Sequence, residues 1–243
     1  MANQYLSEQL GTPEIGATAI ITGGEARHAV TVSRLAVGES VRVGNGSGLV
    51  AGGTVSAVAQ GEFQFVVDEV VESARPSPAI WLAQALAKGD RDELAIQAAT
   101  ELGVDGVIPW TAARSIARWE GAKVAKGQER WNAVVREATK QSTRLWLPEV
   151  SPLVSTKQLA ALAEDTRMIV LDPSADGSLA AIEFDERDIV LVVGPEGGIS
   201  PAEFDLLYAA GAVGARLGSS ILRTSTAGPA AIAVLSATLG RWS

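Results

Sequence analysis

Hydrophobic and polar residues follow a strand-like pattern in the first 70 residues of the chain and a mixed pattern of strands and helices after them. Short segments rich in Val, Ile, Thr and Phe, separated by turns that contain glycine, predict β-strands at 19–22, 40–43, 49–58 and 62–71. A helical pattern at 24–35 interrupts these strands. Gly44-Asn45-Gly46-Ser47-Gly48 joins two of the strands. Because no helical pattern follows it, we interpret it as a hairpin turn rather than a nucleotide-binding loop.

The pattern changes after Arg75-Pro76-Ser77-Pro78, where two prolines at alternate positions favour an extended linker. Beyond the linker we expect strands at 79–87, 104–110, 167–172, 188–193 and 212–217, and helices at 90–102, 126–142, 156–164, 200–210 and 226–242. Strands that alternate with helices indicate a mostly parallel α/β sheet covered on both faces. The sequence therefore predicts a small β domain at residues 1–74 and an α/β domain at residues 75–243.

Two of the predicted helices carry boundary signals. Asp90 followed by Glu93 predicts a capping box at the start of one helix, and Ser200 followed by Glu203 predicts a second capping box. Gly103 is expected to end the first of these helices.

The composition excludes several kinds of chemistry. The 243 residues include no cysteine and one histidine. Thiol nucleophiles, disulfide scaffolds and Cys-ligated metal sites are thereby ruled out, and a Ser-His-Asp triad or a multi-His metal site is not expected. No apolar run reaches the roughly 20 residues of a membrane-spanning helix, and the first residues lack the pattern of a signal peptide. We expect a cytoplasmic protein that needs no metal and no membrane.

The charge is distributed unevenly. A net charge of −8, from 20 Lys and Arg against 28 Asp and Glu, argues against a uniformly basic surface for nucleic acid. Between Arg114 and Arg144, however, eight basic residues accompany three acids, a local balance of +5. The same stretch holds or adjoins Trp110, Trp119, Trp131 and Trp146. Basic side chains and exposed aromatic rings are typical of RNA contacts, but a solvated helix face with buried tryptophans explains the stretch equally well.

Two segments follow predicted strands at the edge where α/β sheets bind ligands. Residues 193–200 contain three glycines within five positions, so the backbone there either approaches a ligand closely or turns sharply. The only charge in this segment is Glu196, which suits a ligand without phosphate, and a cationic one best. In the second segment, 217–227, Arg223 stands among hydroxyl residues. A helix-capping loop with Thr224, Ser225 or Thr226 as the cap would explain the hydroxyls but not the arginine.

These two segments, together with several shorter ones earlier in the chain, resemble the sequence motifs of the SPOUT methyltransferases. More narrowly, they resemble the family that methylates N3 of a uridine in 16S ribosomal RNA. The signature lies in Gly194-Pro195-Glu196-Gly197-Gly198 with Glu203, and in Leu217-Gly218, Ile221-Leu222-Arg223-Thr224 and Thr226-Ala227. Similar blocks precede it at Lys88-Gly89-Asp90-Arg91, Thr100-Glu101-Leu102-Gly103-Val104, Arg114-Ser115, Arg130-Trp131 and Gln141-Ser142. Three positions depart from the family pattern: Ser220 and Ser225 replace an Arg and a Glu, and Ala98 stands where a Lys is common.

The resemblance implies an N-terminal PUA-like β barrel and a C-terminal SPOUT α/β domain with a deep trefoil knot. It also implies a homodimer that uses S-adenosyl-L-methionine and acts on the 16S rRNA of the small ribosomal subunit. The cofactor residues would be Leu171, Asp172, Gly194, Pro195, Glu196, Gly197, Gly198, Leu217, Gly218, Ser219, Ile221, Leu222, Thr226 and Ala227. The RNA-binding residues would be Arg27, His28, Arg34, Lys88, Arg91, Arg114, Arg136, Gln141 and Arg144.

Arg223 is the expected catalytic residue, either stabilising charge on the uracil or positioning it. His28 by itself is more typical of a surface or capping residue than of a catalytic base. The absence of cysteine excludes methyltransferases that use a cysteine nucleophile on pyrimidine carbon, which leaves transfer to nitrogen or oxygen. Two alternatives stay open: a SPOUT enzyme with another RNA target, and an RNA-binding ribosome-assembly factor that has kept the fold and lost catalysis.

Overall fold

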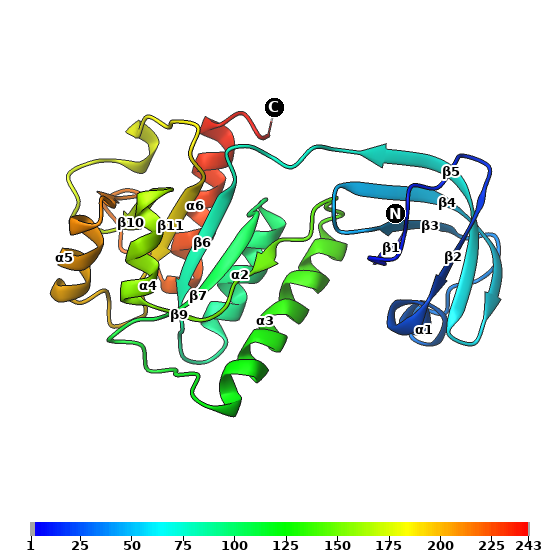
Figure 1. Cartoon of the computed structure of the whole chain (residues 1–243), viewed down its shortest axis with the longest axis horizontal. Helices are drawn as coiled ribbons and strands as arrows, with labels where there is room; N and C mark the ends of the chain where they lie inside the picture. Colours follow the sequence, from blue (N-terminus) through cyan, green and yellow to red (C-terminus); the bar gives the residue numbers. More distant parts are fainter. Residues whose placement is uncertain (1–2, 243) are drawn as a thin grey trace. The chain divides into compact units, whose positions relative to one another are not determined.

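The computed structural model describes residues 3–242, and the chain divides into two compact units (Figure 1). The first unit extends to Arg75 and also includes Thr139–Leu147; the second comprises Pro76–Ala138 and continues from Pro148. The sequence predicted one domain boundary, after residue 74. In the structure the segment Thr139–Leu147 also belongs to the first unit. This return follows a long helix, and nothing in the local sequence pattern signals it.

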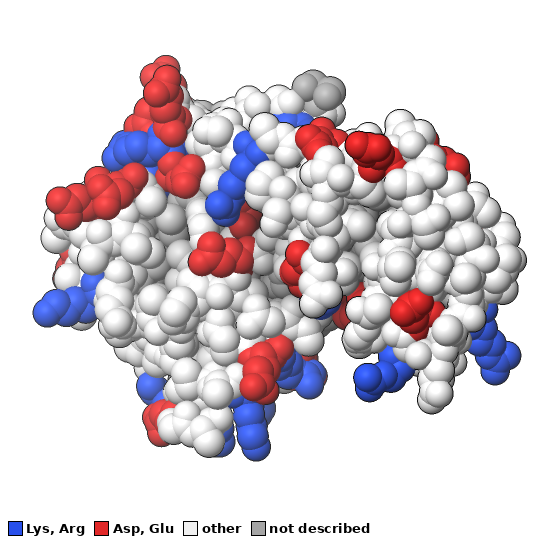
Figure 2. Space-filling view, turned by 45° about the vertical axis from the view of Figure 1, so that its right-hand side comes forward, with Lys and Arg blue, Asp and Glu red and all other residues white. Residues whose placement is uncertain are grey.

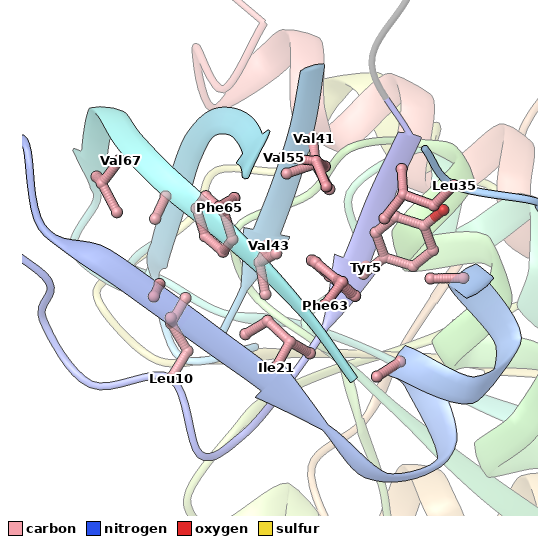
Figure 3. Packing of buried hydrophobic residues seen from close by; sticks show 14 of the residues in the cluster. Tyr5, Leu10, Ile21, Leu35, Val41, Val43, Val55, Phe63, Phe65 and Val67 are labelled. Atoms are coloured by element: carbon pink, nitrogen blue, oxygen red, sulfur yellow. The ribbon is translucent and has the colours of Figure 1, made fainter. Parts of the chain in front are cut away.

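The first unit is a five-stranded sheet in the order β1-β3-β4-β5-β2. Its strands are β1 (Asn3–Leu6), β2 (Thr18–Thr22), β3 (Ser40–Gly44), β4 (Leu49–Ala59) and β5 (Glu62–Glu72). Strand β1 pairs with β3 in parallel, and the other pairs are antiparallel. Alternate residues of β5 point into the core, where Phe63 and Phe65 are fully buried and pack with Tyr5 (Figure 3).

The four predicted strands of this unit are confirmed, but β1 was not predicted and the helix is shorter than expected. Helix α1 covers Gly23–Thr31 and does not continue to Leu35, because the chain turns at Arg34, which has a left-handed φ of 54°. The hairpin turn is confirmed: the Asn45 side chain accepts hydrogen bonds from the backbone N–H groups of Ser47 (2.7 Å) and Leu49 (3.1 Å).

The second unit is built on a sheet in the order β12-β10-β11-β6-β7-β8, with β9 also paired to β7, and every pair is parallel. The strands are β6 (Ile80–Ala85), β7 (Gly106–Thr111), β8 (Glu149–Val150), β9 (Val154–Ser155), β10 (Arg167–Leu171), β11 (Ile189–Val193) and β12 (Val213–Ala215). All five residues of β11 are buried, as expected for a strand covered on both faces. The predicted parallel α/β domain is thus confirmed.

The helices of this unit are α2 (Arg91–Glu101), α3 (Ala122–Gln141), α4 (Thr156–Ala161), α5 (Pro201–Ala209) and α6 (Thr224–Thr238). Two short 3₁₀ turns, Leu162–Glu164 and Leu179–Ala181, complete it. None of the helices in the part of the chain that the structure describes is long and apolar enough to cross a membrane.

The helix boundaries show which of the predicted helix caps form. The Ser200–Glu203 capping box is present at the start of α5. The box predicted at Asp90 is wrong: Asp90 has a left-handed φ of 59° and makes no side-chain cap, and Glu93 pairs with Arg130 instead. The alternative of a hydroxyl cap on the last helix is not observed, because Arg223 occupies the N-cap position without a side-chain hydrogen bond.

Candidate functional site

The carboxyl ends of three neighbouring parallel strands, β12, β10 and β11, open into a pocket of about 520 Å³. The edge of the sheet and the volume are both typical of small-molecule sites in α/β proteins. Eleven of the fourteen predicted cofactor residues line the pocket: Leu171, Asp172, Gly194, Pro195, Glu196, Gly198, Leu217, Gly218, Ile221, Leu222 and Ala227. Arg223, the predicted catalytic residue, lines it as well, whereas Gly197, Ser219 and Thr226 do not.

The glycine segment after β11 is a tight turn, closed by a 2.9 Å hydrogen bond from the Gly198 N–H to the Pro195 carbonyl. A Cβ on Gly194 would lie 2.7 Å from the Ile199 side chain, and one on Gly197 would lie 3.1 Å from the Arg114 Cβ. Close packing within the chain therefore accounts for two of the glycines. Gly218, by contrast, faces open space, since a Cβ at this position would meet no atom within 4 Å, which leaves room for a ligand at that side of the pocket.

Glu196 carries the charge of the glycine turn and is already engaged by neighbours. One of its carboxylate oxygens accepts hydrogen bonds from the backbone N–H of Lys88 (3.1 Å) and from the Arg91 guanidinium (2.9 Å). Partial burial raises the pKa of this carboxyl, but the hydrogen bonds from backbone N–H groups and from Arg91 outweigh it and hold the pKa below the ordinary value. Arg91, predicted to contact RNA, thus partly neutralises the carboxylate that was expected to face a cationic ligand.

Glu203 is the buried anchor of the turn. One carboxylate oxygen accepts from the Ala113 N–H (2.8 Å) and the Thr156 hydroxyl (2.9 Å), and the other accepts from the Ser200 N–H (3.0 Å) and hydroxyl (2.8 Å). Burial raises the pKa of Glu203, yet these four hydrogen bonds lower it below its ordinary value. The ionised side chain therefore fastens the start of α5 to the segment after β7 and to the start of α4.

A second buried connection joins the turn to the last helix. The Thr224 hydroxyl donates to the Gly194 carbonyl (2.8 Å) and accepts from the side-chain amide of Gln84 (2.8 Å). Gln84 is fully buried in β6. Sequence reasoning missed this pair, although an amide within the apolar run 79–87 was a usable signal.

On the opposite side of the pocket, Asp172 follows β10 and interacts with α5. Its carboxylate accepts a 3.1 Å hydrogen bond from the Tyr208 hydroxyl and two from Ser174, from its N–H (2.8 Å) and its hydroxyl (2.6 Å). Burial, together with the Asp172 carboxylate, raises the pKa of Tyr208 to about 12. Partial burial raises the pKa of Asp172, but its three hydrogen bonds leave it below the ordinary value.

Two arginines at the pocket are exposed. Arg223 precedes α6, and Arg216, which the sequence did not single out, follows β12. Within residues 3–242, neither guanidinium makes an ion pair. The pocket therefore offers uncompensated positive charge, and no group of three or more possible metal ligands occurs in the described part of the chain.

The remaining predicted RNA-binding residues are scattered over both units. Arg27, His28, Arg34, Lys88, Arg114 and Gln141 are exposed, and Arg91, Arg136 and Arg144 are half-buried. The guanidinium of Arg114 donates to the Gly197 carbonyl (3.1 Å), which connects it to the pocket. Among the four tryptophans in or beside the basic stretch, Trp110 and Trp131 are buried in the core. For these two, the interpretation as core residues rather than RNA contacts is confirmed.

Family models match both units of the chain. A model described as an RNA methyltransferase domain matches residues 75–236, and a model described as an RNA methyltransferase PUA domain matches residues 21–68. Ribosomal RNA small subunit methyltransferase E of Mycobacterium tuberculosis is 40% identical over 236 residues, which is 95% of this chain and 90% of the relative. The protein of the same name from Bacillus subtilis is 34% identical over 60% of this chain and 57% of its own length.

Solved structures are similar over nearly the whole length of the chain. A ribosomal RNA small subunit methyltransferase E from Neisseria gonorrhoeae, bound to S-adenosyl methionine, matches with a TM-score of 0.86 and 27% identity, over 98% of both chains. A Legionella pneumophila protein in complex with the cofactor SAM also matches with a TM-score of 0.86, at 28% identity over 98% of both chains.

Proposed function

This chain belongs to the RNA methyltransferase family that includes ribosomal RNA small subunit methyltransferase E, and we propose that it methylates N3 of a uridine in 16S rRNA with S-adenosyl-L-methionine as the methyl donor. It is an enzyme of the RNA methyltransferase class. The observation that carries the specific proposal is the pocket at the ends of β10, β11 and β12, which gathers eleven of the fourteen predicted cofactor residues together with Arg223.

The residues of the pocket fit this cofactor. Bound S-adenosylmethionine supplies a methyl group activated on a positively charged sulfur. Apolar side chains of Leu171, Leu217 and Leu222 offer a surface for the purine, and the open space at Gly218 admits a group against bare backbone. Arg91 partly neutralises Glu196, whereas Asp172 makes no ion pair within residues 3–242 and is the carboxylate that could face the cationic sulfur. The Neisseria gonorrhoeae and Legionella pneumophila structures both hold this cofactor.

Arg223 would act on the uracil. The N3 atom can accept a methyl group only after it loses its proton, and the resulting anion spreads its charge onto the neighbouring carbonyl oxygens. The exposed guanidinium of Arg223 can stabilise that charge where it develops. The two carboxylates of the pocket are weak bases, because hydrogen bonds lower the pKa of both Asp172 and Glu196.

The resemblance to the 16S rRNA uridine-N3 methyltransferases also implies features of the fold, the oligomeric state and the location of the protein in the cell. We propose that the second unit is knotted as a deep trefoil, that the first unit closes as a β barrel, and that the enzyme is a homodimer acting in the cytoplasm. The proposal of a knot rests on the family resemblance, and the knot would lie in the part of the sheet with the order β12-β10-β11-β6. Sedimentation of the purified protein tests the dimer, and the Cα trace of a solved structure tests the knot and the barrel.

The direct test of the function is methyl transfer to RNA by the purified chain. Small-subunit rRNA, naked and assembled, is incubated with the protein and S-adenosylmethionine, and its nucleosides are analysed by mass spectrometry. We expect one 3-methyluridine for each 16S rRNA. The same modified nucleoside should be missing from the 16S rRNA of a strain that lacks this protein. A different methylated nucleoside would assign another target, and the absence of any methylation would favour a non-catalytic assembly factor.

A further inference from the structure

A second pocket, of about 330 Å³, lies in the same unit as the first and shares none of its lining residues. It lies between the turn that precedes α2, the loop that follows β7, and α3. Its lining includes Lys88, Asp90, Ile116, Trp119 and Arg130. The function derived above makes no use of this pocket.

Trp119 forms a pre-oriented aromatic wall of the second pocket. Its ring lies directly over Gly127 of α3, where a Cβ would come within 2.3 Å of the indole. It also meets the buried Trp131 edge-on, with ring centroids 5.4 Å apart and an interplanar angle of 81°. The ring is only half-buried, and the exposed Ile116 lines the same pocket. An indole fixed in this way can stack on a planar ligand with little loss of side-chain freedom.

Most of the basic side chains near the second pocket lie at its rim rather than in its lining. Lys88 and Arg130 line it, and the exposed Arg118, Lys123 and Lys126 lie on the adjoining loop and the first turns of α3. Figure 2 shows Lys and Arg side chains, with Asp and Glu side chains among them, along the lower edge of this unit, the region where α3 begins in Figure 1. Basic side chains of this kind hold the phosphates of RNA.

Three acidic side chains line the second pocket: Asp90, Asp92 and Glu93. The Glu93 carboxylate pairs with Arg130. The Asp92 carboxylate accepts hydrogen bonds from the backbone N–H groups of Ala87 (3.2 Å) and Glu93 (2.9 Å). Because the lining carries more acids than bases, we place the phosphates at the rim, on the exposed Arg118, Lys123 and Lys126, and only the uncharged base in the pocket.

Both walls of the second pocket continue into the glycine turn of the first. On one wall, the Lys88 N–H and the Arg91 side chain both bind Glu196. On the other, Arg114 binds the Gly197 carbonyl two residues before Ile116 enters the second pocket. A single strand of RNA with its reacting base in the first pocket would pass these cations to reach the second.

We infer that the second pocket holds the unpaired base of a nucleotide close to the methylated uridine, stacked on Trp119. The inference rests on the proposed function, because it places the flanking RNA relative to the methyl-transfer pocket. It makes Trp119 a residue that determines RNA affinity and sequence context. Trp119 is not assigned any part in the transfer of the methyl group.

The test uses the full chain and an RNA fragment that carries the target uridine, with single abasic nucleotides placed at each flanking position. Trp119→Ala should raise the KM for RNA about tenfold, as expected for the loss of one stacked base, and leave the KM for S-adenosylmethionine unchanged. Trp119→Phe should retain most of the affinity. Trp242→Ala, which removes an exposed tryptophan of the same unit outside both pockets, should change nothing.

The abasic substrates give the decisive result. At one flanking position the missing base should weaken binding to the native chain about tenfold and cause no further loss in Trp119→Ala. Equal penalties in both proteins at every position would overturn the inference. Ile116→Glu, at a side chain 67% exposed, tests the same pocket without disturbing the core and should also weaken RNA binding.

Direct binding of the same fragments, measured by fluorescence anisotropy without cofactor, separates this inference from the proposed function. Coupling between Trp119 and one base in the binding assay supports the pocket even if no methyl group is transferred. A change in oligomeric state in both Trp119→Ala and Ile116→Glu, without such coupling, would assign the pocket to a second copy of the chain and contradict the inference.

Discussion

The hydroxyl of Thr224 donates a 2.8 Å hydrogen bond to the backbone carbonyl of Gly194, 30 residues earlier in the chain. Because the same hydroxyl accepts from the buried amide of Gln84, one side chain connects the last helix, the glycine turn and the central strand β6. The first turn of α6 and the turn after β11 are thus held in fixed relation. The shape of the pocket depends on that relation.

Thr224→Val should lower both stability and cofactor affinity. The substitution keeps the shape of the side chain but leaves the Gln84 amide and the Gly194 carbonyl without this partner, at a cost of about 1–3 kcal/mol. Denaturant unfolding and calorimetric titration with S-adenosylmethionine measure the two effects. Thr224→Ser should restore both, and Thr238→Val, which alters an exposed hydroxyl on the same helix, should change stability by less than about 0.5 kcal/mol. Native behaviour of Thr224→Val would show that the hydroxyl does not support the pocket.

Gly218→Trp should abolish cofactor binding without unfolding the chain. The position has no atom within 4 Å of a Cβ and lines the pocket, so the new ring can enter the space that the cofactor needs without a clash inside the chain. We expect at least a tenfold weaker affinity in calorimetry and an unchanged thermal midpoint. Gly24→Trp, at another glycine with open space around its Cβ, is the matched control. Equal cofactor binding by both variants would place the cofactor elsewhere.

Arg223→Ala should reduce turnover about 10²–10³-fold, the usual effect of removing one group that stabilises developing negative charge. The affinity for S-adenosylmethionine should change little, because Arg223 is assigned to the uracil. Arg223→Lys keeps the charge and should recover part of the rate, and Arg187→Ala, at an exposed arginine paired with Asp185, should match the native rate. A loss confined to cofactor affinity would contradict the assigned role.

Glu203→Gln should destabilise the chain near neutral pH by about 1–3 kcal/mol, since an amide nitrogen cannot accept the hydrogen bonds of the carboxylate it replaces. The folded-state pKa of Glu203 lies below its ordinary value of 4.5. Its contribution is therefore complete above that pH and is lost as the pH falls through the folded-state value. The difference in unfolding free energy between native chain and variant should narrow below pH 4.5. Glu183→Gln, at an exposed position, should show no such dependence.

Replacing Arg27 and Arg34 together by alanine should weaken RNA binding and flatten its dependence on salt. If each arginine contacts one phosphate, the slope of log affinity against log salt should fall by about 1.5. Binding of small-subunit rRNA between low and moderate salt measures the slope, and Arg187→Ala serves again as the control for lost charge. An unchanged slope would show that neither arginine contacts an RNA phosphate.

Local signals in the sequence predicted local structure well. The Ser200–Glu203 capping box formed as expected, because its partners lie within one turn of helix. The same signature failed at Asp90, where Glu93 finds Arg130 on a distant helix. Strand β1 was missed for a related reason: four residues carry little pattern, and their partner β3 lies nearly 40 positions away.

The candidate site was predictable as a set of segments but not as a set of contacts. The glycine turn and the Arg223 region lie where the sequence placed them, at the ends of parallel strands. The engagement of Glu196 by Arg91 spans 105 residues, and no spacing rule signals it. The role of Thr224 was missed because its hydroxyl bonds to the turn and to β6 instead of capping its own helix.

The bond between Gln84 and Thr224 joins residues that are 140 positions apart. During synthesis the strand that holds Gln84 emerges from the ribosome long before the helix that completes the pocket. Until residue 224 has been released and has docked on the glycine turn, the nascent chain has no finished site for the methyl donor. The pocket is therefore among the last features of the fold to form, and a chain that ends before residue 224 lacks it.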